Sequence, residues 1–387
     1  MLKLECQVLI IGGGIVGLSL AKGLEQQGIS YLLVDDGVQK IHKTTRPLAL
    51  SKTSIAILKY LNVWNDIRNF STPIESIHVS VEGHFGALKL GEAGHEYLGR
   101  VIDLNELQTI LMRKLSLQQQ VKSGRFVHYD KNSKEVQLFC DEQELRVKAQ
   151  IIIAADGALS SVRACSGLGV EAETEQQAII GTLGFQWPHH GQAFERFTEW
   201  GPLALLPWKT HEMAMVWSMS KENALHLQQS DYPSLIKKQL AHRLGPIVDC
   251  SAIRTYPLRQ IFMPVQNFQN ILFLGNAAHT LHPVAGQGFN LSLRDVMTFL
   301  NILKENGIHP GVFPIYMLKR RDDQRFTKFL TRFLAGGFHR LPGFLKGIGL
   351  SALGNHSTLK QLFSYYAQGM GYPLPLSIYQ ILESSDE

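Results

Sequence analysis

The stretch QVLIIGGGIVGLSLAKGLEQQGISYLLVDD, residues 7–36, predicts how the chain begins to fold. An apolar run that ends at Ile11 is typical of a strand buried on both faces. Leu20 and Leu24 then share one helical face, and Gly28 stands where a glycine often follows the end of a helix. A second apolar run completes the pattern, which predicts a strand, a glycine turn, a helix and a strand in a βαβ unit.

Gly12, Gly14 and Gly17 form the pattern G-x-G-x-x-G in the turn between that strand and that helix. The first glycine permits the tight turn, the second lets a pyrophosphate approach the backbone, and the third lets the helix pack against the strand. The phosphates would lie at the positive N-terminus of the helix. Asp35 ends the next strand, where its carboxylate can accept a hydrogen bond from a ribose hydroxyl, with Asp36 as the alternative acceptor. The sequence therefore predicts a dinucleotide site.

Two later apolar runs predict further strands of the same parallel sheet. IIIAADG (151–157) and NILFLGN (270–276) each end in a polar residue beside a glycine. Residues 74–90 and 176–262 instead show short alternating stretches punctuated by glycine and proline, which is typical of antiparallel strands. We therefore expect a parallel nucleotide-binding sheet interleaved with a second, antiparallel sheet.

Composition limits the class of protein. The chain has 387 residues, 45% hydrophobic and 18% charged, which is typical of a soluble globular protein with one large or two interleaved domains. Its four cysteines lie far apart without metal-ligand spacing, so we expect reduced thiols in the cytoplasm.

The first residues carry Glu5 and pass into a glycine turn, unlike a signal peptide. No stretch approaches the ~20 apolar residues of a membrane span. We therefore expect a cytoplasmic protein, either free or peripheral on the inner face of the bacterial membrane.

Three separated stretches carry a resemblance to a known family. Besides the glycine turn, these are Asp156 and Gly157 with the following Arg163, and the stretch GNAAHTLHPVAGQGFNLSLRD at 275–295. The arrangement resembles the FAD-binding fold of the single-component aromatic hydroxylases typified by p-hydroxybenzoate hydroxylase. Arg46, in TTRPLALS, falls where that family has an arginine near FAD. The resemblance implies that the dinucleotide is FAD.

The resemblance also implies the architecture. We expect an α/β fold with a Rossmann-like FAD-binding domain, an interleaved antiparallel-sheet substrate domain and C-terminal helices. The expected divisions are 1–73, 97–175 and 265–312 for the FAD-binding domain, 74–96 and 176–264 for the substrate-binding β-sheet domain, and 313–387 for the C-terminal helical region.

The third stretch is where we expect the flavin ring. Gly286, Gln287 and Gly288 would bring backbone N–H groups to the electron-rich edge of the ring, and the helix that continues through Asn290 would add its dipole. A Cβ at Gly288 is therefore expected to be harmful. By resemblance, Pro283 would lie beside the flavin, where its backbone shapes the reaction face.

Further features narrow the resemblance to one branch of the family. Residues 193–220 and 254–264 resemble the branch that acts in ubiquinone biosynthesis. Gly275 is followed by Asn276 where the general motif has an aspartate, and this Gly-Asn form is similar to that of the polyprenyl-methoxyphenol hydroxylases. An asparagine can still form a hydrogen bond with a ribityl hydroxyl, so we expect Gly275 and Asn276 to contact the cofactor.

The resemblance implies hydroxylation of a polyprenylated phenol. In such a cycle NAD(P)H reduces FAD, oxygen forms a C4a-hydroperoxyflavin, and the terminal oxygen passes to the phenol ring. Two other functions fit the same residues: a flavoprotein reductase or dehydrogenase, and a non-catalytic flavin-binding subunit of a ubiquinone-biosynthesis assembly. Against the second, the glycines, Asp35, Asp156 and Arg163 are all intact.

His279 and His282 do not predict a metal site. The pair lacks a cysteine or carboxylate companion at ligand spacing and stands inside the expected flavin motif. We expect His279 to support the motif through a hydrogen bond and His282 to line the substrate side.

The net charge is 38 − 33 = +5, and basic side chains alternate with aromatic ones over residues 313–354. This pattern is typical either of a solvated helix face or of a surface that contacts an anionic membrane or a partner protein. No nucleic-acid module accompanies the charge, so we expect no nucleic-acid partner. The basic residues of the segment are Lys319, Arg320, Arg321, Arg325, Lys328, Arg332, Arg340 and Lys346.

Overall fold

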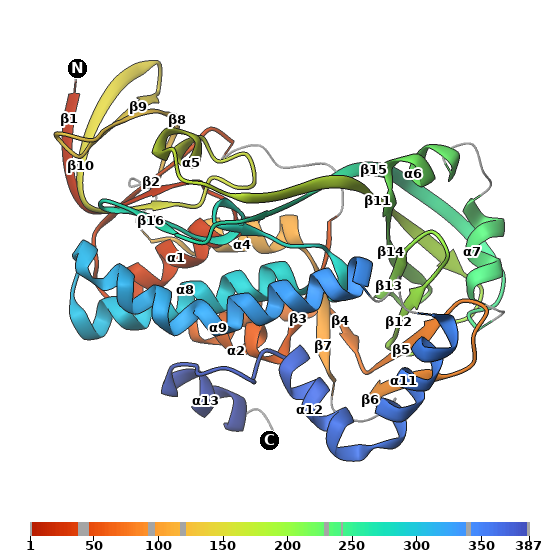
Figure 1. Ribbon diagram of the computed structural model, residues 1–387. Coiled ribbons are helices and arrows are strands. Elements are labelled where there is room, and N and C mark those ends of the chain that lie inside the picture. The colour runs from red at the N-terminus through yellow and green to blue at the C-terminus, as the bar shows by residue number, and fades with distance from the viewer. Residues whose placement is uncertain are drawn as a thin grey trace.

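The computed structural model describes residues 2–37, 46–91, 97–116, 121–227, 232–240, 243–337 and 342–384. Within these residues the strands form sheets of seven, eight and three strands. Figure 1 shows the seven-stranded sheet at one end of the molecule and the eight-stranded sheet at the other, with long helices running between them. The fold is the α/β architecture that the sequence predicts.

Parallel pairing builds the first end of the molecule. β1 (Leu2–Ile11) pairs in parallel with β2 (Tyr31–Asp35) and with β10 (Gln143–Ala154), and β10 pairs in parallel with β17 (Ile271–Phe273). The apolar residues at the carboxyl ends of these strands are buried, as expected for a sheet covered on both faces. Both later apolar runs thus form the predicted parallel strands. The other strands of the sheet are β8 (Val121–Asp130), β9 (Glu135–Cys140) and β16 (Asn267–Phe268).

The eight-stranded sheet is antiparallel apart from one pair. In order across the sheet, its strands are β18 (His279–Thr280), β15 (Ile247–Phe262), β11 (Glu171–Phe185), β14 (Glu212–Ser220), β13 (Pro202–Lys209), β12 (Gln192–Phe197), β5 (Ser76–Val81) and β6 (Ala87–Gly91). The exception is β12, which pairs in parallel with β5. These two strands come from separate segments that no hairpin joins, so nothing imposes an antiparallel pairing.

The antiparallel strands predicted from the sequence are otherwise confirmed, with two differences. Helices α6 (Lys221–Leu227) and α7 (Tyr232–Leu240) interrupt the second alternating stretch, where we expected strands alone. The short strand β18 belongs to the glycine-rich third motif and yet pairs with β15. That motif is therefore attached to both large sheets.

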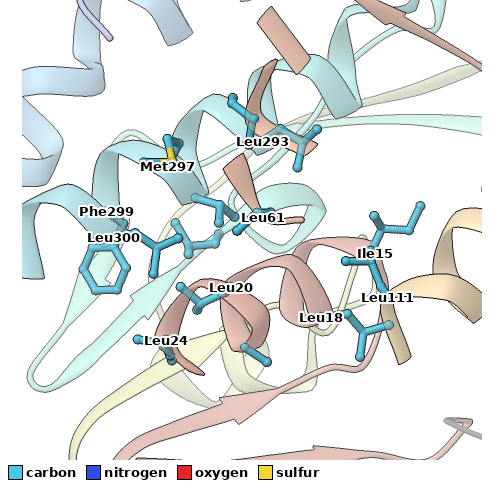
Figure 2. Packing of buried hydrophobic residues seen from close by; sticks show 14 of the residues in the cluster. Ile15, Leu18, Leu20, Leu24, Leu61, Leu111, Leu293, Met297, Phe299 and Leu300 are labelled. Carbon is cyan, nitrogen blue, oxygen red and sulfur yellow. The ribbon is translucent and has the colours of Figure 1, made fainter. Parts of the chain in front are cut away.

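Helices α1 (Ile15–Gln26) and α8 (Gln287–Asn306) pack against each other over the seven-stranded sheet. Figure 2 shows Leu20 and Leu24 of α1 on the side that faces Leu300 of α8. A glycine at position 23 permits this approach, because a Cβ there would collide with the Leu300 side chain. Two further helices of this layer are α2 (Lys52–Tyr60) and α4 (Leu104–Lys114).

The smallest sheet connects the two larger ones. β7 (Gly99–Asp103) pairs with β3 (Pro47–Ser51) and with β4 (Thr72–Ile74). On one side these strands contact β13, and β3 also contacts the short 3-10 helix η4 (Val284–Gly286). The three-stranded sheet therefore holds the third motif against the wall of the eight-stranded sheet.

The C-terminal part is helical, as the sequence predicts. α9 (Phe313–Arg332) lies along α8 (Figure 1), and α11 (Gly343–Asn355) packs on β5 and β6. The helices that follow are α12 (Ser357–Ala367) and α13 (Leu376–Glu383). Among the described helices, none combines the length and the apolar character needed to cross a bilayer. Arg340, one of the basic residues noted above, lies outside the described residues.

Candidate active site

A cavity of about 890 Å³ is lined by residues from all three sheets and from the N-termini of α1 and α8. Its volume is in the range of small-molecule and cofactor sites. The predicted site residues that line it are Gly14, Asp35, Arg46, Gly157, Asn276, Pro283, Gly286, Gln287, Gly288 and Asn290. The predicted site residues outside the lining are Gly12, Gly17, Asp156, Arg163 and Gly275. The structure thus brings the three motifs to one cavity.

The turn after β1 presents an open helix N-terminus to this cavity. At Gly12 (φ 115°) a Cβ would collide with the Ala155 carbonyl, and at Gly17 it would collide with the carbonyl of Gly12. Gly14 differs, because no atom lies within 4 Å of the position of its missing Cβ. No side chain caps α1, and its first turn carries no acidic residue. Uncapped N–H groups beside open space are the geometry of a phosphate site.

Asp35 braces the same turn. Its Oδ2 accepts a hydrogen bond from the Gly13 N–H at 2.6 Å, and its Oδ1 accepts one from the Gly37 N–H at 2.7 Å. Asp36 lines the cavity as well, so both candidate ribose acceptors lie at this end. The sequence analysis missed Gln108 of α4, which lines the cavity and donates to the Gly13 carbonyl at 3.1 Å. No local motif marks Gln108, since only the packing of α4 on α1 brings it to the turn.

The Asp-Gly motif supports the backbone of the site. Asp156 Oδ2 accepts from the Val162 N–H at 3.2 Å, while its Oδ1 is buried without a hydrogen bond in the described chain. The Arg163 guanidinium donates to the Ala158 carbonyl at 2.6 Å and to the Ala277 carbonyl at 2.7 Å. Arg163 therefore joins the second motif to the third, and it reaches them without lining the cavity.

The N-terminus of α8 is a second open helix end at the cavity. Gly286 (φ 60°) precedes the helix, no side chain caps it, and its first turn has no acidic residue. Every residue of 286–290 lines the cavity. The position of a Cβ on Gly288 meets only the Leu281 Cβ, at 4.0 Å. This end of the cavity can therefore stabilise negative charge on a bound group.

Asn290 fastens this helix end to the three-stranded sheet and α2. Its Oδ1 accepts from the Ser51 N–H at 2.9 Å and from the Ser54 hydroxyl at 2.6 Å. Its Nδ2 donates to the carbonyls of Ala49 at 2.9 Å and Gly286 at 2.7 Å. All the hydrogen-bonding capacity of this amide is used within the protein, so Asn290 positions the helix end.

The two histidines of the third motif have different surroundings. His279 Nε2 lies 2.5 Å from the Asp295 carboxylate, and both side chains are fully buried. His282 lines the cavity, and its Nδ1 accepts from the Val284 N–H at 3.2 Å. Burial lowers the pKa of His282 to about 4, so the ring is neutral at neutral pH. His279 thus makes a supporting hydrogen bond, as expected, while the expected place of His282 on the substrate side stays a prediction. In the described chain, no three His, Cys, Asp or Glu side chains gather as metal ligands would.

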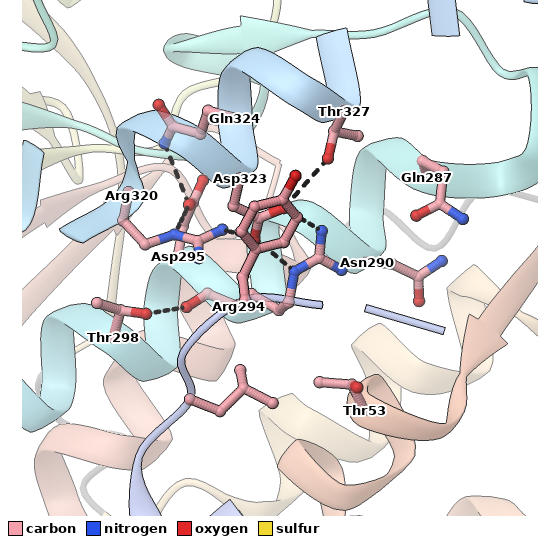
Figure 3. A network of polar contacts seen from close by, with 12 residues as sticks. Thr53, Gln287, Asn290, Arg294, Asp295, Thr298, Arg320, Asp323, Gln324 and Thr327 are labelled. Atoms are coloured by element: carbon pink, nitrogen blue, oxygen red, sulfur yellow. Dashed lines mark hydrogen bonds and ion pairs between the residues drawn. The ribbon is translucent and has the colours of Figure 1, made fainter. Parts of the chain in front are cut away.

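Buried ion pairs join α8 to α9 behind the cavity (Figure 3). Arg320 Nε lies 2.6 Å from Asp295 and its Nη2 lies 2.5 Å from Asp323, while Arg294 contacts Asp323 through two hydrogen bonds of 2.7 and 2.9 Å. Burial alone would raise the pKa of Asp323, but Arg320 and Arg294 hold it well below its usual range. The stability that these pairs contribute is therefore present at neutral pH and is lost as acid protonates the carboxylates.

The position of Arg320 corrects the sequence analysis. We expected Arg320 on a basic surface, but its side chain is only 1% exposed. Lys346 is also buried. Acidic side chains lie beside other basic residues of the segment, in the ion pairs Lys319–Glu305, Arg321–Asp322, Lys328–Glu171 and Arg332–Glu171. The segment therefore carries less uncompensated positive charge than its sequence suggests.

Comparison with known proteins matches the chain to a family described as an FAD binding domain, over residues 5–306. The chain belongs to this family. It is 29% identical to the 3-demethoxyubiquinol 3-hydroxylase of Escherichia coli, over 94% of this chain and 98% of that protein. It is 27% identical to a ubiquinone hydroxylase of Rhodospirillum rubrum, over 94% and 89% of the two chains. The crystal structure of p-nitrophenol 4-monooxygenase from Pseudomonas putida has the same fold, with a TM-score of 0.78, 17% identity, and coverage of 97% and 100%.

These comparisons confirm the predicted family, that of the FAD-dependent aromatic hydroxylases with ubiquinone-biosynthesis relatives. The residues of the cavity also fit FAD on structural grounds. Gly14 and Gly288 border space that a Cβ would enter, and each stands at an uncapped helix N-terminus. One helix end suits the pyrophosphate and the other suits the electron-rich edge of the ring.

We expect Gly288→Ala to fold normally and to bind FAD more weakly. The added methyl group meets no protein atom closer than 4.0 Å, so only a bound ring competes for its space. A steric cost of about 1–3 kcal/mol would weaken binding about 5- to 150-fold. Titration of the apoprotein with FAD measures the effect. Gly169→Ala is the control, because Gly169 is exposed, open and outside the cavity. Equal affinities for the two variants would exclude this placement of the ring.

Arg320→Gln should lower the free energy of unfolding by about 3–5 kcal/mol, because it leaves Asp295 buried with one charged partner fewer. Urea denaturation at neutral pH measures this loss. The matched control is Arg321→Gln, whose exposed side chain pairs with Asp322 and should change stability by less than about 0.5 kcal/mol. Similar losses for both variants would contradict the role assigned to the buried pairs.

Proposed function

We propose that the chain is an FAD-dependent monooxygenase that hydroxylates the ring of a polyprenylated phenol in ubiquinone biosynthesis, with NAD(P)H as the electron donor. The observation that carries the proposal is a single cavity that extends from the dinucleotide turn, past the N-terminus of α8, to an apolar chamber. The hydroxylase activities of the two relatives support the reaction class, and the chamber supports a long apolar substituent.

The chain would bind and orient the reactants. Bound FAD would supply the redox chemistry and the activation of oxygen. The N-terminus of α1 would hold the pyrophosphate, Asp35 a ribose hydroxyl, and the backbone of 286–288 the ring edge. Pro283 and His282 line the cavity beside this helix end, and the neutral His282 ring would leave the local charge unchanged. The surrounding sheets would exclude water from the reacting groups.

The apolar chamber would hold the prenyl chain. It lies between strands β5 and β6 on one side and the end of α9 with α11 on the other. An isoprenoid chain placed there would bury apolar surface without covering charged groups. The chamber residues are Val79, Leu88, Leu90, Phe197, Leu330, Phe333, Leu334, Leu350 and Leu353.

We also propose that the substrate domain comprises residues 74–96 and 176–264, as the sequence suggests.

The purified, FAD-loaded protein should consume oxygen and NAD(P)H in equal amounts with the formation of a hydroxylated prenylphenol. Oxygen uptake, NAD(P)H oxidation and product mass, measured together, test this. NAD(P)H oxidation without hydroxylated product would instead identify a reductase. A protein that stays colourless after FAD is added would favour the non-catalytic subunit. Mass analysis of the quinone precursor that accumulates after gene deletion would identify the position hydroxylated.

We further propose that the enzyme takes its substrate from a membrane through the surface of α9 and α11. The same two helices line the apolar chamber with their inner faces, at Leu330 and Leu350. Large apolar side chains on their outer faces are exposed, namely Phe329 (65%), Phe344 (56%), Leu345 (45%) and Ile348 (50%). Since acidic partners lie beside several of the basic residues, apolar insertion would contribute more than charge.

The double variant Phe344→Ser and Ile348→Ser should bind vesicles at least about tenfold more weakly. Each exposed side chain that inserts contributes a fraction of the roughly 1.5–3 kcal/mol of full burial. Sedimentation with vesicles of phosphatidylethanolamine and phosphatidylglycerol measures the partition. Val248→Ser removes an apolar side chain of β15 that is even more exposed, at 67%, and should have no effect. If Arg325→Glu abolished binding and the double variant did not, charge would be the dominant attraction.

A further inference from the structure

One carboxylate lies in the middle of the cavity wall. Glu195 of β12 lines the cavity, and in the sheet it pairs with Val79 of β5 and Ala204 of β13. Beyond Ala204, the next partner is Val216 of β14, which also lines the cavity. The other acidic lining residues in the described chain, Asp35 and Asp36, belong to the dinucleotide end. Glu195 is therefore an isolated acid on an apolar face of the sheet.

The neighbours of Glu195 along β12 place it between two regions of the cavity. Ala193 packs near Ala49, the residue whose carbonyl accepts a hydrogen bond from Asn290 at the flavin end. Phe197 packs with Leu350 in the apolar chamber. Alternate residues of a strand share a face and lie about 7 Å apart. Glu195 therefore lies about 7 Å along the strand from Ala193, at the flavin end, and about 7 Å from Phe197, in the apolar chamber.

Glu195 has no hydrogen bond or ion pair within the described part of the chain. Burial raises the pKa of Glu195 to about 7 and is the cause of the shift. The titratable residues nearest in sequence and across the sheet, Arg196 and His78, alternate with cavity-lining residues and so belong to the opposite face. The other titratable lining residues come from other segments: Asp35 and Asp36 stand at the end of β2, Arg46 directly before β3, and His282 in the loop before α8.

We propose that Glu195 is the base that removes the phenolic proton of the substrate ring. The inference rests on the proposed function. In this step the phenolic O–H bond breaks, the proton moves to a carboxylate oxygen of Glu195, and the electron pair stays on the phenolic oxygen. No electron passes to or from the protein. NAD(P)H supplies two electrons for the overall reaction. One atom of O₂ is inserted at a ring carbon, and the hydrogen displaced from that carbon returns as a proton to the phenolic oxygen. The other oxygen atom leaves as water, which takes up the proton held by Glu195. The ionised ring is the more electron-rich form and accepts an oxygen atom more readily.

The surroundings of Glu195 suit proton transfer, and they do not stabilise the folded protein. The pKa of this carboxyl group is higher in the folded state than in the unfolded state. The folded protein therefore loses stability as pH rises from the unfolded-state pKa to the folded-state pKa. A base whose pKa lies near the working pH is, in contrast, efficient at proton transfer. Glu195→Gln should therefore raise the melting temperature above pH 7 while it removes the base.

The test compares the FAD-loaded wild type with Glu195→Gln, Glu195→Asp and Glu212→Gln, using 2-farnesylphenol as the probe. Glu212 is the matched control, since it lies on β14, pairs with Lys209 and does not line the cavity. In the wild type and Glu212→Gln, kcat/KM for hydroxylation should fall as pH drops below about 7. Glu195→Gln should lose this dependence and react at least about 100-fold more slowly at high pH. Glu195→Asp should retain the dependence at a reduced rate.

One result would overturn the role of Glu195, and a different result would overturn the monooxygenase assignment. If Glu195→Gln binds FAD and hydroxylates the probe with the pH profile of the wild type, Glu195 is not the base, while the monooxygenase assignment stands. If the wild type forms no hydroxylated product from the probe although FAD is bound and reduced, the monooxygenase assignment itself fails.

Discussion

The register of three parallel strands determines where the site forms. Ile11 of β1 pairs with Ala154 of β10, and Ala154 pairs in turn with Phe273 of β17, so the three strands end at one level. Within three residues each strand is followed by a glycine with positive φ: Gly12 at 115°, Gly157 at 84° and Gly275 at 59°. Such backbone angles disfavour other residues. The sharp turns that result leave room for helix ends and for a ligand at the same edge of the sheet.

Local patterns explain why this part of the fold could be predicted from sequence. Strand, glycine turn and helix follow one another between Leu2 and Gln26, and each of these parts has its own residue preferences. The same holds for the second and third motifs, which follow apolar runs directly. The antiparallel strands were predictable as a class from their alternation. Their order across the sheet was not, because the parallel pairing of β12 with β5 joins segments that are far apart in the chain.

Arg320 and Arg321 illustrate what the sequence could not reveal. The two arginines are adjacent, yet one is buried among carboxylates and the other is exposed. From Arg320 onward the buried face of α9 is polar, so hydrophobic periodicity gives no sign of which side faces inward there. The buried polar residues of α9 are Arg320, Asp323, Gln324, Thr327 and Thr331. Their complement is Asp295 and Arg294 on α8, and only the three-dimensional contact between the two helices distinguishes such a stripe from a solvated surface.

The charged groups behind the cavity and the carboxyl group on its wall have different surroundings, with different consequences. Behind α8, two arginines face two aspartates at distances of 2.5–2.9 Å, so the charges compensate and hold the helix end in place. At Glu195 a carboxylate lies on an apolar wall with no compensating partner in the described chain. A buried charge without a partner destabilises a fold, and residues that break this rule concentrate where proteins do chemistry. The paired charges fix the geometry of the helix end, while the unpaired acid remains free to exchange a proton with whatever enters the cavity.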